Sequence, residues 1–133
     1  MTNSEMKAEG AVGKVFDLAE RTAKFGEHVI AFCKTVPITV ISEPLIRQLV
    51  KSGTSVGANY CEADDAVSGK EFRQKIGTCK KESRESKFWF RMIAKAEPGL
   101  VEQARTLWSE AHELHLIFAS IFRKLSTTKP KPR

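Results

Sequence analysis

The stretch SGTSVGANYCEA, from Ser52 to Ala63, decides the fold, because its composition and its spacing point to different structures. Two glycines, two serines, a threonine and an asparagine are typical of turns and loops. The core-phase positions nevertheless recur at steps of four and three residues straight through the glycines: Leu45, Leu49, Ser52, Val56, Asn59 and Ala63. A loop has no reason to keep the period of a helix, so this pattern predicts a helix.

We expect this helix to begin with Ser42 as its N-cap, to carry Pro44 in its first turn, and to end near Asp64. Each interior glycine costs about 1 kcal/mol relative to alanine, so packing must offset the loss. Gly53 and Gly57 lie four residues apart and are expected to let a neighbouring backbone approach closely.

Three further segments show the same amphipathic period. They follow Val15 to Val36, Phe72 to Ile93 (with Ser68 and Glu71 as a capping box) and Leu100 to Leu125. Short connections, roughly 37–42, 64–68 and 96–99, favour antiparallel neighbours. The sequence therefore predicts an all-α, antiparallel up-down-up-down four-helix bundle over residues 13–126. A flexible N-terminus is expected at 1–12 and a basic flexible tail at 127–133.

Composition indicates one soluble domain, since 41% of the 133 residues are hydrophobic and 29% are charged. No apolar run approaches the roughly 20 residues of a membrane span, and the N-terminus lacks the apolar core of a secretion signal. We therefore expect a cytoplasmic protein without a membrane partner. Cys33, Cys61 and Cys79 are too few and too scattered for a disulfide framework or a zinc site, which indicates reduced thiols.

The net charge of +6 is concentrated in one helix, because residues 68–96 contain nine Lys/Arg and three Glu. Most of these cations form a single row that is expected opposite the apolar face: Lys70, Arg73, Lys80, Arg84, Lys87, Arg91 and Lys95. A solvated helix face usually mixes signs, so the row is a candidate nucleic-acid-binding surface. No aromatic residue lies within it, which predicts recognition through backbone charge with weak sequence preference. The alternative is a solubilising face, or one that pairs with Glu43 or Glu110 of neighbouring chains.

Polar residues occupy core-phase positions on the second and third helices, namely Ser52, Asn59, Ser83 and Ser86. Folding the two helices back near Val67 places Ser52 opposite Glu82 and Ser83, and lets Glu62 or Asn59 reach Lys75. Such a cluster is either a ligand pocket or, as we favour, a satisfied network that sets the register of two helices.

Two rows with a spacing of seven residues lie beside the main apolar stripes. One contains Lys75, Glu82 and Trp89, and the other contains Val101, Trp108, His115 and Phe122. A second row with large aromatic residues predicts an oligomer interface formed by Trp89, Val101, Trp108, His115 and Phe122. A broad core within one subunit is the alternative.

No motif indicates catalysis, a cofactor or a metal. SGKEF lacks the residues of a phosphate-binding loop, and His112 and His115 in HELH are three residues apart rather than the four of a zinc protease. Neither histidine follows a Glu by three residues, as a di-iron bundle requires. We expect no enzymatic activity.

The residues of helices two and three resemble the four-helix bundle proteins encoded in intervening sequences of bacterial 23S ribosomal RNA genes, the S23-type family. The family pattern is matched by Ser55, Val56, Gly57, Ala58, Asn59, Glu62, Glu71, Phe72, Lys81, Glu82, Glu85, Phe88, Trp89 and Phe90, while Gly53 replaces a family serine. We refer to Ser55, Asn59, Glu62, Lys75, Glu82 and Glu85 as the polar motif cluster.

The resemblance implies an antiparallel bundle that assembles as a homopentamer and has no established enzyme activity. A distant relative of the same fold is the accessory protein of diversity-generating retroelements, a basic pentamer that binds reverse transcriptase and RNA. Three hypotheses follow: an oligomer that binds RNA or a nucleic-acid-bound protein such as a reverse transcriptase, a protein-only interaction module, and, least favoured, an enzyme or metal protein.

Overall fold

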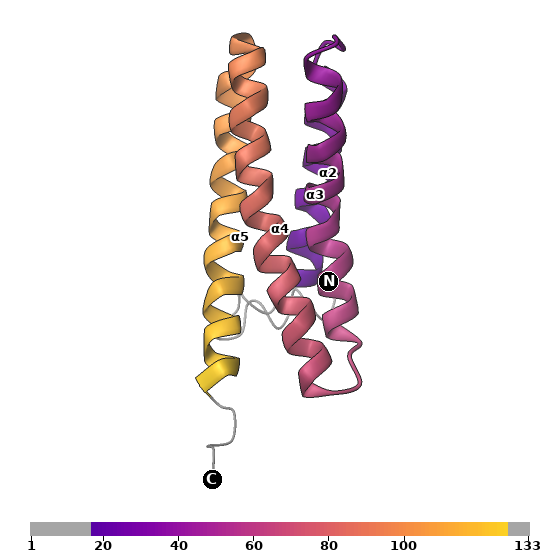
Figure 1. Cartoon of the computed structure of the whole chain (residues 1–133), viewed down its shortest axis with the longest axis vertical. Helices are drawn as coiled ribbons and strands as arrows, with labels where there is room; N and C mark the ends of the chain where they lie inside the picture. Colours follow the sequence, from indigo (N-terminus) through magenta and orange to yellow (C-terminus); the bar gives the residue numbers. More distant parts are fainter. Residues whose placement is uncertain (1–16, 128–133) are drawn as a thin grey trace.

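The computed structural model describes residues 17–127, which form four α-helices and one short 3-10 turn. The elements are α2 (Leu18–Thr35), α3 (Ser42–Asp64), α4 (Gly69–Ala96), η3 (Pro98–Leu100) and α5 (Val101–Thr127). Figure 1 shows an antiparallel bundle in which α2 and α3 form one hairpin and α4 and α5 the other. The predicted all-α four-helix bundle is confirmed. The predicted N-terminal segment, the start of the first helix at Val15 and the basic tail lie outside the described residues.

The stretch Ser52–Ala63 is helical throughout, as its spacing predicts. A Cβ on Gly57 would lie 3.2 Å from the carbonyl oxygen of Thr22 in α2, so here two backbones meet. A Cβ on Gly53 would lie 2.7 Å from a methyl group of Val29, so at this position the helix receives a side chain instead. The glycines therefore let α2 pack closely against α3.

The start of α3 differs from the expected cap. Ser42 is the first helical residue rather than the N-cap. Thr39 takes the capping role, since its hydroxyl accepts a hydrogen bond from the Ser42 amide at 2.9 Å while the Ser42 hydroxyl accepts one from the Thr39 amide at 2.9 Å. This reciprocal pair begins three residues earlier than Ser42 and satisfies the amides of Thr39 and Ser42. At α4 the expected cap is confirmed, because Ser68 accepts the Glu71 amide at 3.1 Å.

The core contains aliphatic and aromatic residues from all four helices of residues 17–127. Phe90 of α4 makes edge-to-face contacts with Phe25 and Phe32 of α2 at ring-centroid distances of 6.3 and 5.7 Å.

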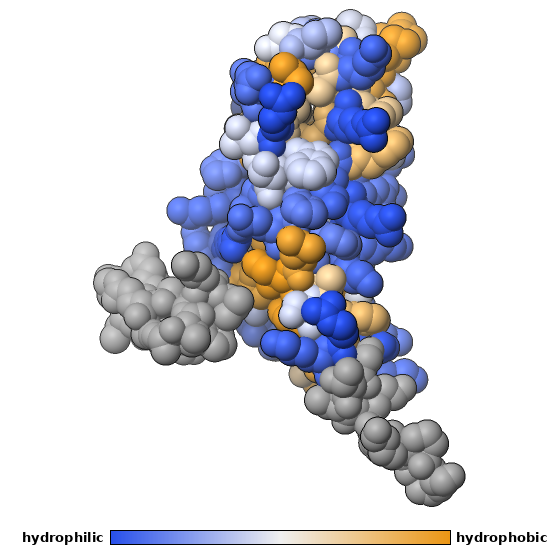
Figure 2. Space-filling model, turned by 90° about the vertical axis from the view of Figure 1, so that its left-hand side faces the viewer, coloured by the Kyte–Doolittle hydropathy of each residue, from blue (hydrophilic) through white to orange (hydrophobic). Residues whose placement is uncertain are grey.

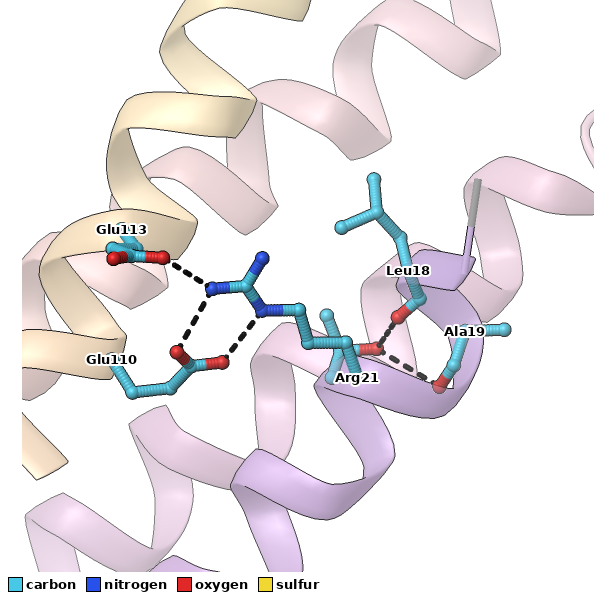
Figure 3. A network of polar contacts seen from close by, with 6 residues as sticks. Leu18, Ala19, Arg21, Glu110 and Glu113 are labelled. Atoms are coloured by element: carbon cyan, nitrogen blue, oxygen red, sulfur yellow. Dashed lines mark hydrogen bonds and ion pairs between the residues drawn. The ribbon is translucent and has the colours of Figure 1, made fainter. Parts of the chain in front are cut away.

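Figure 3 shows how α2 is also connected to α5 by an ion-pair bridge. Arg21 donates to both oxygens of Glu110 at 2.8 and 2.9 Å and to Glu113 at 2.6 Å. This bridge joins the two hairpins at their edge.

No helix within residues 17–127 is long and apolar enough to cross a membrane.

Candidate nucleic-acid interface

The row of cations on α4 borders α5, so only part of it lies opposite the apolar face as expected. Arg73, Lys80 and Lys87 are half-buried against α5. The other four cations are exposed: Lys70, Arg84, Arg91 and Lys95. For these three half-buried cations the expectation was wrong, because α4 packs against both α3 and α5. Its buried arc is therefore wider than one apolar stripe.

The half-buried cations lie over aromatic rings of α5. The Arg73 guanidinium is 4.1 Å from the centre of the Phe122 ring, and the Lys80 ammonium is 5.2 Å from the same ring. The Lys87 ammonium is 5.3 Å from the Trp108 ring. Cation–π contacts of this kind contribute about 0.5–2 kcal/mol, depending on desolvation.

No aromatic residue lies within the row itself, as the sequence shows, but aromatic rings of a neighbouring helix lie against it. The aromatic rings come from α5, where a search along α4 alone could not find them. A signal was present, because Arg73 and Phe122, Lys80 and His115, and Lys87 and Trp108 are each equally distant from the turn at Glu97 and Pro98. Pairing the third and fourth predicted helices about that turn would have placed the cations over the rings.

The two histidines of HELH take part in this arrangement. His112 stacks on Trp108 with ring centroids 5.2 Å apart, and its Nδ1 lies 3.0 Å from the Lys87 ammonium, which can donate to it. His115 Nδ1 lies 3.1 Å from the Lys80 carbonyl oxygen, to which it can donate. Burial, together with the charges of Lys87, Lys80 and Arg84, lowers the pKa of His115. Within residues 17–127, no group of three or more metal-ligating side chains is placed to hold an ion.

Most cations of the row have no carboxylate counter-charge in the part of the chain that the structure describes. Leaving Arg73 aside, none of its other six cations forms an ion pair with a carboxylate of the described chain. Burial, and then the charge of Arg84, lower the pKa of Lys87. The acidic partners considered from the sequence are already engaged, since Glu110 pairs with Arg21 and Glu43 pairs with Arg47. An anion that binds here would relieve the repulsion.

The polar motif cluster does not form one network. Asn59 donates to the carbonyl and hydroxyl oxygens of Ser55 at 2.9 Å within α3, and neither Asn59 nor Glu62 pairs with Lys75 in the described chain. On α4, Glu85 accepts a hydrogen bond from the Trp89 indole at 3.3 Å. Burial and the neighbouring Glu85 raise the pKa of Glu82.

The buried serines provide the contact between α3 and α4 instead. Ser52 and Ser86 share a hydrogen bond of 2.9 Å, and the Ser86 hydroxyl also donates to the Glu82 carbonyl. Ser52 therefore lies about one turn further along α4 than the expected position opposite Glu82 and Ser83. The expected register was wrong because the fold-back point lies nearer Gly69, where α4 begins, than Val67. These contacts favour a satisfied hydrogen-bond network that sets the register of the two helices over a ligand pocket.

The residues expected at an oligomer interface are divided between two environments. Phe122 and His115 are half-buried by contacts with α4 of the same subunit, as in the broad-core alternative. Val101 is half-buried, and Trp89 is half-buried and packs edge-on against Phe88, which is 51% exposed. Trp108 retains 36% exposure. Figure 2, which views the α5 side, shows a mainly hydrophilic surface with an apolar patch in its lower half.

Two of the three cysteine thiols are structural. Burial raises the pKa of Cys33 to about 11 and that of Cys79 to about 12, so neither is a ready nucleophile. Cys61 is exposed, and all three are free thiols.

Comparison with known proteins identifies a structural relative. The fold is similar to that of a crystal structure described as a protein of unknown function from the S23 ribosomal protein family of Bacteroides thetaiotaomicron. The TM-score is 0.69 and the sequence identity 25%, over 79% of this chain and 97% of that chain. The likeness supports the S23-type resemblance. No family model matches the chain, and no curated protein matches it.

Proposed function

We propose that this protein is a non-enzymatic, homo-oligomeric four-helix bundle that binds RNA, or a protein carrying RNA, through the basic face of α4. The observation that carries the proposal concerns the six cations of the row other than Arg73. None of these six has a carboxylate partner in the described chain. Four cations of the row are exposed and free to meet phosphates. In an oligomer, every subunit repeats this face. Five subunits, and the link to retroelement accessory proteins, are what the family resemblance adds to the proposal.

A charge-reversed variant tests the proposal. The exposed cations are changed to Glu (Lys70, Arg84, Arg91 and Lys95), while Lys80 and Lys87 are kept because they pack on rings. The matched control reverses four exposed cations of α2 and α3: Lys24, Lys34, Arg47 and Lys51. Affinity for a structured RNA is measured against salt concentration, with circular dichroism and light scattering as checks of folding and assembly.

We expect the α4 variant to fold and assemble as the parent does, but to lose low-salt affinity. Each phosphate contact contributes about 0.7–0.9 to the slope of log affinity against log salt, so the slope should fall by about 3. The control should retain most of the slope. Unchanged binding by the α4 variant would contradict the proposal, as would absence of binding by the parent at about 50 mM salt.

One observation favours a second candidate, a protein-only interaction module. Arg73, Lys80 and Lys87 already pack on rings of the same subunit, so part of the row has a structural use. A parent that binds no RNA but retains a stable protein partner would support this candidate.

A further inference from the structure

A cleft opens between α4 and α5 at the C-terminal end of the cation row. Its volume is about 480 Å³, within the range of small-molecule sites. Phe90 and Ala104, which are 1% and 2% exposed, belong to the core and form its apolar base together with Ala94. The polar members of its lining are Arg91 on α4, and Arg105 and Ser109 on α5.

Trp108 also lines the cleft, and its indole is held in place. His112, one turn further along α5, stacks on the indole at an interplanar angle of 15°. Lys87 lies over the same ring and bonds His112. Ala104 and Arg105 lie one turn in the other direction along α5, and both line the cleft together with Trp108. A preorganised ring at the edge of an open apolar cleft is the element on which a nucleobase stacks.

The charge of the cleft is one-sided. Arg91 and Arg105 stand on different helices, and no carboxylate is among the residues that line the cleft. Arg105 contacts Glu102 at 3.2 Å, but both side chains are more than half exposed, at 65% and 79%. An exposed pair of this kind contributes little to stability and yields readily to a phosphate.

We infer that this cleft binds one unpaired base of an RNA strand, stacked on Trp108, with the flanking phosphates held by Arg91 and Arg105. The inference rests on the proposed function and specifies its ligand, because it adds recognition of a single-stranded base to recognition of backbone charge. The cation row of α4 then leads the strand to the cleft.

The test compares two strands of equal length and charge, a single-stranded RNA and the same backbone without bases. Affinities for the parent, Trp108→Ala and Phe88→Ala are measured by fluorescence anisotropy at low salt. Phe88→Ala is the matched control, since Phe88 is an exposed aromatic residue on α4 that does not line the cleft. Trp108→Phe, which keeps a ring, provides a second variant.

We expect the parent to prefer the RNA over the abasic strand by between about 5-fold and 150-fold, the equivalent of ~1–3 kcal/mol for one stacked base. Trp108→Ala should bind the RNA only as well as the abasic strand, with unchanged affinity for the latter. Trp108→Phe and Phe88→Ala should keep most of the preference.

The outcomes separate this inference from the proposed function. Equal binding of both strands by the parent would contradict base stacking in the cleft but would leave RNA binding by the basic face supported. Failure of the parent to bind either strand would contradict both. Binding of a free mononucleotide as tightly as the RNA would make the cleft a mononucleotide site and overturn the inference. A fall in the mass of the oligomer for Trp108→Ala would assign the indole to a subunit contact, with the same consequence.

Discussion

A side chain at Gly57 would crowd the backbone of α2, because a Cβ would approach the carbonyl oxygen of Thr22 to 3.2 Å and its carbonyl carbon to 3.3 Å. Backbone atoms cannot rotate aside, so we predict that Gly57→Leu destabilises the bundle severely. Overpacking of this kind costs about 1–3 kcal/mol and occasionally more. The measurement is urea unfolding. Gly69→Leu is the control, since a Cβ at Gly69 meets nothing within 4 Å. Equal unfolding midpoints for the two variants would reject close packing at Gly57.

A second single residue, His115, makes the stability of the protein depend on pH. Burial lowers its pKa, so the folded state favours the neutral ring. As pH falls below the unfolded value of about 6.5, the unfolded chain binds a proton that the folded chain binds less readily, and stability decreases. We predict that His115→Asn, whose amide can still donate to the Lys80 carbonyl, loses less stability than the parent between about pH 7.5 and 5.5. Parallel losses in urea titrations would show that His115 does not contribute.

At the scale of the elements, the packing of α2 against α5 includes an ion-pair bridge, whose contribution can be compared with that of a surface ion pair on α3. Arg21 reaches Glu110 and Glu113 on α5 with a side chain that is 25% exposed, and these hydrogen bonds raise its pKa further. Arg47 and Glu43 form an i,i+4 pair on the surface of α3. We predict that Arg21→Gln costs about 1–3 kcal/mol of unfolding free energy, whereas Arg47→Gln costs less than about 0.5 kcal/mol. Similar losses for the two would show that the bridge is no stronger than a surface pair.

At the scale of the whole molecule, the exposed apolar surface bears on assembly. Leu116 is 53% exposed and lines an apolar hollow with Phe72, Ile117 and Ile121, on a subunit of 14.9 kDa. Such surface is more common at interfaces than on monomers. We predict that light scattering at micromolar concentration gives a multiple of the subunit mass, with five as the number that the resemblance implies. A mass near that of one subunit would contradict the prediction.

The helices and their order followed from the sequence alone. The spacing of apolar residues is a local property of the sequence. It continues through Gly53 and Gly57 because the buried positions of a helix recur at this spacing, whichever residues stand between them. The cap at Ser68 was likewise readable, since its partner Glu71 is three residues away. The cap of α3 was misplaced because Thr39 and Ser42 are both competent, and only the path of the loop decides which one precedes the helix.

The candidate site needed the tertiary structure. The cations and the aromatic rings were each visible as rows, but their contact depends on the register and rotation of α4 against α5, which packing between the helices sets. From the sequence, the row was predicted to lie opposite the core, because one helix taken alone is expected to bury only one stripe of residues. In the bundle α4 has neighbours on two sides, so Lys80 and Lys87 lie over rings while Arg84 and Arg91 face solvent. Which cations are free to bind and which help hold the fold was decided by packing between helices, a property that no single helix carries.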